Sequence, residues 1–265
     1  MTSLVSRIVV AAVLLPVVLI VVWAGGWWVF GLAAIFAMVA LHELSLLTRG
    51  LRPVLLAGYA GALAALLGAS LGGPEWALAG FLTTFPLAFL FKGLAGVRPT
   101  TVSVAATLLG SAWIGLGLAH MILIRELPEH GVLAAYAVLL TVFASETSSY
   151  VVGRLFGRHK LAPRTSPGKT WEGLIGGTAA AFIVPFFAFY GEEALLDVPR
   201  SLALGAAIAV AAPMGDLFES AIKRDADVKD SGQVLGGHGG MLDRLDSILF
   251  SAIAGYYVFV AFGAA

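Results

Sequence analysis

The chain has 265 residues, of which 59% are hydrophobic and only 12% are charged. Soluble domains carry about twice that share of charged residues, so the composition excludes an ordinary water-soluble fold and predicts an integral membrane protein. Sixteen basic and sixteen acidic residues cancel, which argues against a nucleic-acid partner, and the absence of cysteine excludes disulfides and thiolate metal sites.

Nine segments are apolar and long enough to cross a bilayer as helices, because a hydrocarbon core about 30 Å thick needs roughly 20 helical residues. Backbone groups in hydrocarbon must be hydrogen-bonded within the segment, and no strand-like alternation is evident. The first segment follows Arg7 without a later small-residue cleavage site, so we interpret it as a span rather than a signal peptide. We expect an all-α, polytopic transmembrane helical bundle. Its about nine spans cover residues 8–24, 27–47, 54–72, 76–92, 102–124, 131–152, 172–190, 201–221 and 247–264.

The basic residues orient this predicted bundle. Fourteen of the sixteen fall before the first span or after an even-numbered one, and only Arg125 and Arg200 fall on the opposite side. Cytoplasmic loops retain Lys and Arg, so this asymmetry predicts a cytoplasmic N-terminus and an external C-terminus. The external loops then carry acidic residues such as Glu75 and Glu193.

The two halves of the chain differ in chemical content. Residues 1–140 are mostly Ala, Leu, Val and Gly, which predicts a transmembrane scaffold half, whereas residues 141–265 carry the polar cytoplasmic loops and predict a catalytic half. His42 and Glu43 form an ionisable pair within the second predicted span. Two interpretations stay open for this pair: a functional site, or a polar contact that packs helices.

One face of the eighth predicted span is polar at its cytoplasmic end. Asp216, Glu219, Ser220 and Lys223 are spaced by three and four residues, so a helix places them on one side. Such a face is costly in a membrane unless it lines a wet cavity or binds an ion. A solvated charged loop or a structural ion pair is the alternative.

A second pair of carboxylates, Asp243 and Asp246, opens the ninth predicted span after a Gly-rich turn around His238. Carboxylate oxygens hold hard cations such as Mg²⁺, Lys and Arg neutralise phosphate oxygens, and Gly-rich turns let backbone N–H groups approach phosphates. The stretch is neither a Walker loop nor a dinucleotide fingerprint. It predicts nucleotidyl transfer from a triphosphate at a magnesium site.

Residues 220–246 resemble the signature of the phosphatidate cytidylyltransferase family, also called CDP-diacylglycerol synthase. The matching positions are Ser220, Lys223, Arg224, Lys229, Asp230, Gly232, His238, Gly239, Gly240, Asp243, Arg244 and Asp246. Upstream, residues 166–173 (SPGKTWEG) resemble a second family block, and residues 215–217 (GDL) resemble the turn before the signature.

The resemblance implies that CTP and phosphatidate give CDP-diacylglycerol and diphosphate at the cytoplasmic side of a bacterial cytoplasmic membrane. It implies Mg²⁺ as cofactor, with a second, monovalent cation left open, and a bilayer, an anionic phosphatidate-like lipid and a second copy of the chain as partners. The implied catalytic residues are Asp216, Lys223, Asp243 and Asp246, and the metal ligands are Asp216, Asp243 and Asp246, with Glu146 as a further candidate. The implied nucleotide and phosphate residues are Ser166, Lys169, Thr170, Glu172, Ser220, Arg224, Lys229, Asp230, His238, Gly239, Gly240 and Arg244.

The chain departs from the family at residues 146–150, where Glu-Thr-Ser-Ser-Tyr stands in place of Asp-Thr-Gly-Ala-Tyr. Glu146 then ligates a cation with a longer reach, or it forms a packing or ion-pair contact, with Arg154 as one partner. Two other functions stay open. A CTP-dependent polyprenol or other lipid kinase would use a similar pocket, and a secondary transporter would place its charges at mid-membrane depth in repeated halves.

Overall fold

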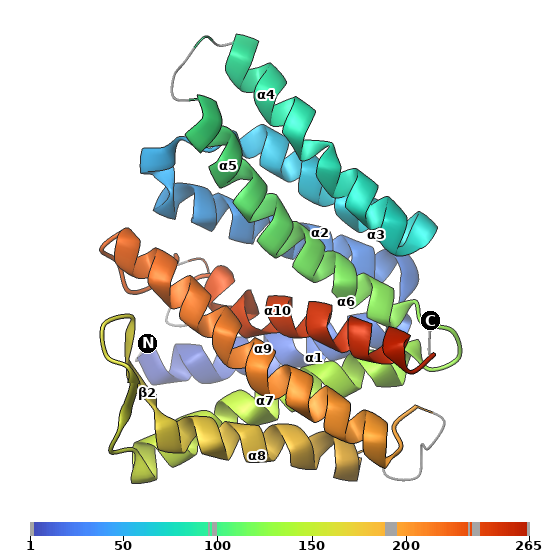
Figure 1. Cartoon of the computed structure of the whole chain (residues 1–265), viewed down its shortest axis with the longest axis vertical. Coiled ribbons are helices and arrows are strands. Elements are labelled where there is room, and N and C mark those ends of the chain that lie inside the picture. Colours follow the sequence, from blue (N-terminus) through green and yellow to red (C-terminus); the bar gives the residue numbers. More distant parts are fainter. Residues whose placement is uncertain are drawn as a thin grey trace. The chain divides into compact units, whose positions relative to one another are not determined.

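The computed structural model describes residues 3–94, 96, 100–188, 195–232, 234 and 239–263, with side chains from residue 13 onward (Figure 1). His238, Glu193 and Arg98 lie outside the described residues. Helices dominate, and seven helical stretches in the described part of the chain are long and apolar enough to cross a membrane. The all-α prediction is therefore confirmed. The chain divides into two compact units, which we call unit 1 (residues 1–126 and 226–245) and unit 2 (residues 127–225 and 246–265).

Unit 1 contains the N-terminal helices. They are α1 (Ser3–Ala24), α2 (Gly26–Leu47), a 3₁₀ turn (Arg49–Leu51), α3 (Leu55–Leu82), α4 (Thr84–Leu94), α5 (Thr100–Gly110), a π-helical turn (Ser111–Leu116) and α6 (Gly117–Arg125). The turn joins α5 to α6 without interruption, as the predicted span 102–124 requires. Each predicted N-terminal span has a helical counterpart.

Helix α3 folds back on itself at Gly73, whose φ of 80° is accessible at low cost only to glycine. Gly68 lies against the backbone of Trp76, and Gly80 lies against the backbone of Ala64, so a Cβ at either position would collide with the facing arm. The stretch predicted as two spans, 54–72 and 76–92, is thus a tight helical hairpin without an intervening loop.

The first arm of α3 runs parallel to α5 and α6. The backbone N–H of Val54 donates to Thr107 Oγ1 at 2.8 Å, and Ser111 Oγ donates to the carbonyl of Gly58 at 3.2 Å. Both contacts join residues 53 positions apart, which requires the two segments to run in the same direction. Arg125, at the end of α6, donates through Nε to the carbonyl of Val22 at 2.6 Å, so the last turns of α1 and α6 meet at the same end of unit 1.

Unit 2 contains α7 (Gly131–Phe156), β1 (Lys160–Ala162), β2 (Ser166–Thr170), α8 (Trp171–Ala188), α9 (Val198–Asp225) and most of α10 (Leu242–Ala261). Small residues bring α7 and α8 close together, because Gly173 faces the carbonyl of Ser149 and Gly177 faces Ser145 and Ser149. Gly215 of α9 lies against the carbonyl of Asp246 in α10. These close approaches leave room only for glycine.

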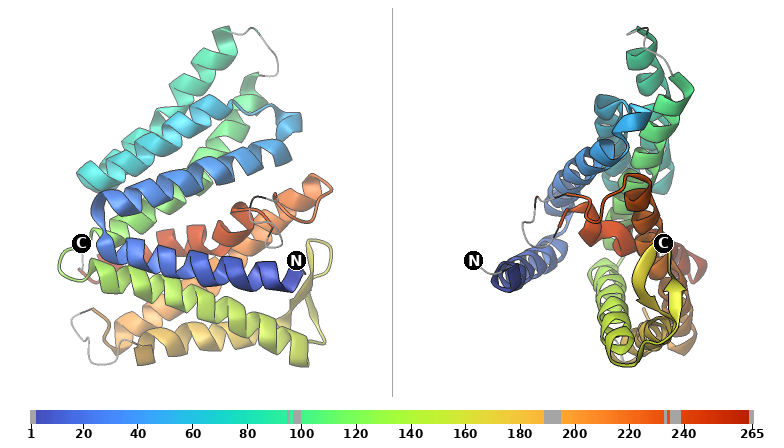
Figure 2. Two further views of the ribbon diagram at one scale, coloured as in Figure 1. Left: turned by 180° about the vertical axis from the view of Figure 1, so that it is seen from behind. Right: turned by 90° about the vertical axis from the view of Figure 1, so that its left-hand side faces the viewer.

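The segment between α7 and α8 is an antiparallel β-hairpin, which the sequence analysis did not predict (Figure 2). Lys160 pairs with Thr170 and Ala162 pairs with Ser166. The N–H of Trp171 also donates to the carbonyl of His159 at 3.0 Å. The hairpin continues directly into α8, so the predicted phosphate residues Ser166, Lys169 and Thr170 are held on a strand rather than on an open loop.

Candidate active site

An ion pair in unit 2 connects the hairpin to α9. Lys169 Nζ lies 2.7 Å from Asp216 Oδ2, and the two side chains keep 21% and 34% of their surface exposed. The hydroxyl of Ser220, one turn further along α9, donates to Asp216 Oδ1 at 3.3 Å. Three residues predicted for the site are therefore in direct contact, on a surface that water and a polar ligand can reach.

A second ion pair lies on the same helix, α9, and is almost fully buried. Lys223 Nζ lies 2.6 Å from Glu219 Oε2, and the side chain of Glu219 keeps only 1% of its surface exposed. Glu219 lies on the polar face that the helical spacing predicts, but it is not among the predicted site residues. A buried charge needs a partner, and here the helical spacing of four residues supplies it.

Four carboxylates gather in unit 2, and we call them the acidic cluster. Asp246 is buried in the first turns of α10, where the charges of Asp216, Glu146 and Glu219 act on it. Its Oδ1 accepts the backbone N–H of Ser247 at 2.7 Å. Like charges at close range repel one another, so this arrangement calls for cations.

The donor set of the acidic cluster fits Mg²⁺, which prefers carboxylate oxygens and retained waters. Among the described residues, no three acidic or histidine side chains already surround a common point at ligand distances. Asp216 is engaged by Lys169 and Ser220, and Asp246 by a backbone N–H. The chemistry of the residues therefore suits the cation, although their side chains are turned to protein partners.

The hairpin is fixed at its base by Glu172, a predicted nucleotide residue in the first turn of α8. Its carboxylate accepts the backbone N–H of Arg158 at 3.1 Å, the N–H of His159 at 3.2 Å, and contacts His159 Nδ1 at 2.6 Å. Thr170 is buried, and its Oγ1 accepts the N–H of Gly173 at 3.1 Å at the start of α8. In this structure both side chains hold the hairpin on α8 and thereby position Lys169.

Arg224 ties the far end of the hairpin to α9, since its Nε donates to the carbonyl of Thr165 at 3.2 Å. Arg154, by contrast, donates to the hydroxyl of Tyr150 at 2.7 Å, with its guanidinium 6.0 Å from the centre of that ring. The contact of Glu146 that bears on the site is electrostatic and involves Asp246.

In unit 1, the described residues of 226–241 belong to the middle of the signature, between α9 and α10, and we call them the signature loop. Glu43 of α2 is buried and binds both described ends of this loop. Its Oε1 accepts the N–H of Met241 at 3.0 Å, and its Oε2 accepts the N–H of Leu242 at 2.9 Å and the hydroxyl of Ser231 at 3.1 Å. Glu43 is therefore a polar contact that orders the predicted site.

Asp243 binds the same loop from its other side. Its Oδ2 accepts the N–H of Ser231 at 3.0 Å and the N–H of Gly240 at 2.8 Å. Gly239 has a φ of 80°, and a Cβ there would lie 2.6 Å from Asp243 Oδ2. The glycines predicted to approach phosphate thus also give room to Asp243, whose role as a metal ligand stays a prediction.

The other described residues that the signature predicts for the site are at the surface. Lys229, Asp230 and Arg244 are exposed, in positions where their charged groups can meet a ligand. None of them contributes to the core of unit 1.

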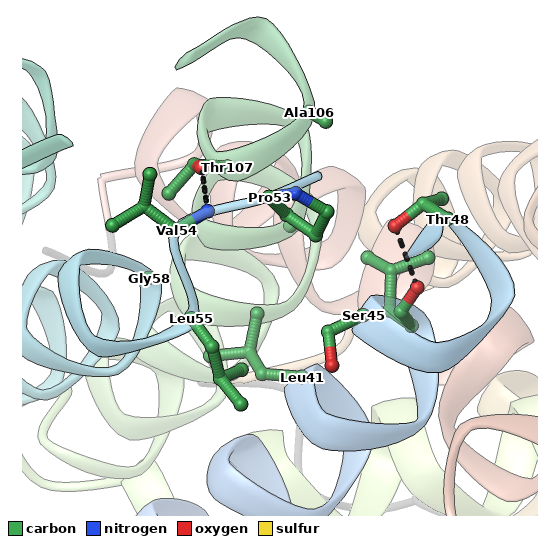
Figure 3. A pocket seen from close by; sticks show the side chains of 11 residues that line it. Leu41, Ser45, Thr48, Pro53, Val54, Leu55, Gly58, Ala106 and Thr107 are labelled. Carbon is green, nitrogen blue, oxygen red and sulfur yellow. Dashed lines mark hydrogen bonds between the residues drawn. The ribbon is translucent and has the colours of Figure 1, made fainter. Parts of the chain in front are cut away.

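A cavity of about 20 Å³ lies in unit 1 between α2, α3 and α5 (Figure 3). Leu41, Val54, Leu55, Ala106 and Thr107 are among its lining residues. This volume holds about one water molecule, so the cavity is too small for a nucleotide.

Comparison with known proteins relates the whole chain to one family. The sequence model of the Cytidylyltransferase family matches residues 5–262. The chain is 39% identical over 153 residues to the phosphatidate cytidylyltransferase of Staphylococcus haemolyticus, covering 58% of each protein. It is 42% identical over 125 residues to the phosphatidate cytidylyltransferase of Haemophilus influenzae, covering 46% of this chain and 43% of that protein. The match thus spans about half the length of these relatives. Since the family model covers nearly every residue, the chain belongs to the Cytidylyltransferase family.

Proposed function

We propose that the chain is a membrane-embedded phosphatidate cytidylyltransferase, which converts CTP and phosphatidate into CDP-diacylglycerol and diphosphate. The observation that carries the proposal is the Lys169–Asp216 pair, which links the family block at residues 166–173 to the turn before the signature at the acidic cluster. The names of the Staphylococcus and Haemophilus relatives supply the substrate class.

The reaction is an in-line attack by a phosphate oxygen of the lipid on the α-phosphorus of CTP. The new bond joins that oxygen to the α-phosphorus, and the bond from the α-phosphorus to the bridging oxygen breaks to release diphosphate. The attacking oxygen is already anionic, so little proton removal is needed and no general base is assigned. Catalysis then rests on positioning and charge neutralisation by Lys169, Lys223 and Arg224, with Ser166, Thr170 and Ser220 as hydroxyl donors.

The residues proposed to hold Mg²⁺ are Asp216, Asp246 and Glu146, together with Asp243 from the signature. When bound, the cation neutralises the charge of the triphosphate and of the departing diphosphate. Lys229, Asp230, His238, Gly239, Gly240 and Arg244 are assigned to the nucleotide phosphates from the signature alone. A second, monovalent cation and association of two copies remain part of the proposal.

The ends of unit 1 support the proposed topology. Trp23, Trp27, Trp28 and Trp76 lie at the end that holds the turn at Gly73, and they are 64–72% exposed, as residues at a membrane interface are. The opposite end carries Arg49, Arg52 and Lys92 and also the signature loop that Glu43 binds. We infer that this basic end faces the cytoplasm.

A count of nine spans follows if the two arms of the α3 hairpin and helix α1 each cross the bilayer. Arg125 and Arg200 are the two basic residues on the predicted external side, and both have structural partners. Arg125 binds the end of α1, and Arg200 donates to the carbonyl of Phe262 at 3.5 Å. Their place on the external side therefore does not weaken the assignment.

The test uses purified protein in mixed micelles of phosphatidate and detergent, with Mg²⁺ and CTP labelled at either the α- or the γ-phosphate. We expect the lipid product to carry the α-label and the γ-label to appear in diphosphate. Label from the γ-phosphate in the lipid would identify a lipid kinase and overturn the proposal. A protein that forms no labelled lipid but moves phosphate-bearing solutes across vesicles would be a transporter.

A further inference from the structure

Glu43 lies far from the signature loop in sequence but binds it directly, with 188 to 199 residues separating it from its partners. All of these contacts are within unit 1. The carboxylate is 2% exposed and receives three hydrogen bonds, two from backbone N–H groups and one from a hydroxyl. A surface charge with a merely solubilising role would not be buried in this way.

The backbone is shaped to admit this carboxylate. A Cβ at Gly232 would lie 2.5 Å from Glu43 Oε1, and a Cβ at Gly240 would lie 2.5 Å from Glu43 Oε2. The glycines of the loop therefore let its two ends close around an acid supplied by another helix. Asp243 accepts the N–H groups of Ser231 and Gly240, so both described ends of the loop are bound by carboxylates.

Glu43 also occupies the N-terminus of α10. The N–H groups of Met241 and Leu242 point out of the first turn, where a helix attracts an anion. With Glu43 in that place, a nucleotide phosphate cannot use these two donors. The carboxylate instead holds the first turn of α10, which carries Asp243.

We propose that Glu43 is a positioning residue, which fixes the signature loop and the start of α10 so that their side chains meet the nucleotide in one geometry. The kinetic part of this inference rests on the proposed function. The contacts of the Glu43 carboxylate are with the hydroxyl of Ser231 and the N–H groups of Met241 and Leu242, so its proposed effect on the reaction is indirect. Its removal loosens the loop, which raises the KM for CTP and lowers kcat while leaving the KM for the lipid unchanged.

The variant is Glu43→Gln, which preserves size but presents an N–H₂ group to at least one backbone donor. Hydrogen exchange in the full-length protein should become faster at residues 240–242, and kcat/KM for CTP should fall about 10- to 100-fold. Ser231→Ala removes one of the three bonds and should change both measurements less. The matched controls are Glu75→Gln, an exposed acid at the other end of unit 1, and Ser45→Ala in α2, whose hydroxyl binds only its own helix.

The outcomes separate this inference from the proposed function. Unchanged exchange at residues 240–242 in Glu43→Gln would overturn the anchor itself. A second outcome is faster exchange together with a parental KM for CTP and a smaller fraction of active protein. That outcome would overturn the positioning role, because loss of a purely structural residue lowers the amount of folded protein without changing the KM. If the parental protein makes no CDP-lipid, the proposed function fails, and the exchange measurement alone then upholds or refutes the anchor.

Discussion

Asp246 is a buried carboxylate near three others. Burying an acid among like charges lowers the stability of the folded protein. Asp216, Glu146 and Glu219 act on it electrostatically, and Lys169 and Lys223 pair with Asp216 and Glu219. Buried acids that lie among like charges are typical of functional sites, where residues are arranged for function at the expense of stability.

We expect Asp246→Asn to lower activity without lowering thermal stability, because Asn has nearly the same size and keeps an oxygen that can accept the N–H of Ser247. Loss of a proposed cation ligand should reduce CDP-lipid formation about 100-fold or more. Melting temperature without Mg²⁺ and turnover with Mg²⁺ are the measurements. Asp225→Asn, at the exposed end of α9, is the control and should change neither. Parental turnover in Asp246→Asn would remove this residue from the proposed magnesium site.

Helical spacing was enough to predict which residues of α9 share a face, because Asp216, Ser220 and Lys223 are local to one helix. The partners across elements were not predictable in the same way. Lys169 reaches Asp216 only because a hairpin carries it there, and Glu43 finds Ser231 only in the folded chain. An acid within an apolar span was the one available signal for Glu43, and it left two interpretations open.

At the scale of elements, the β-hairpin is the largest departure from the prediction. Its strands are three and five residues long and contain Pro167 and Gly168, which disfavour strands, so no alternation of apolar and polar residues marks them. The helices were predictable within a few residues because each carries a long apolar run. A short strand forms because it pairs with a neighbouring strand, and the sequence of either strand alone does not identify that neighbour.

The hairpin depends on Glu172 at its base. Glu172→Gln replaces an acceptor of three donors by a side chain with one acceptor oxygen, so the hairpin should open more often. Limited trypsin digestion should then cut severalfold faster after Arg164, and the KM for CTP should rise. The same substitution at the exposed Glu75 should leave the cutting rate unchanged. A parental cutting rate with lost activity would instead assign Glu172 to direct nucleotide contact.

The crossing of α9 and α10 requires glycine at residue 215. A Cβ there would collide with the carbonyl of Asp246, so Gly215→Ala should force the helices apart and destabilise the protein by about 1–3 kcal/mol. Gly31→Ala is the matched control, since a Cβ at Gly31 meets no atom within 4 Å and alanine favours helix. Thermal unfolding of both variants checks the difference, and equal melting temperatures would refute the close crossing.

At the scale of the whole molecule, the proposed topology makes a prediction that single-cysteine labelling can check, since the chain has no native cysteine. A cysteine at position 75 should react with a membrane-impermeant reagent added to intact cells, whereas cysteines at 92 and 169 should react only after permeabilisation. Labelling of residue 169 from outside would overturn the cytoplasmic assignment of the site. Residue 193 offers a second external position.

The two compact units do not follow the order of the chain, because residues 226–245 belong with the N-terminal helices. The predicted halves, 1–140 and 141–265, were drawn from chemical content, and that functional division stays a prediction. Compactness depends on which segments pack together, and the contact of Glu43 with Ser231 is an example that composition does not reveal.

The late arrival of Ser231 has a consequence for biosynthesis. Translation adds about 5–20 residues per second, so the 188 residues between Glu43 and Ser231 take roughly 10–40 s to make. During that interval the carboxylate of Glu43 lies in an inserted helix without its hydrogen-bond donors, because those residues have not yet been translated. N-terminal fragments that stop before residue 231 should therefore be degraded faster by membrane proteases than the same fragments carrying Glu43→Gln, which exposes no unmatched charge.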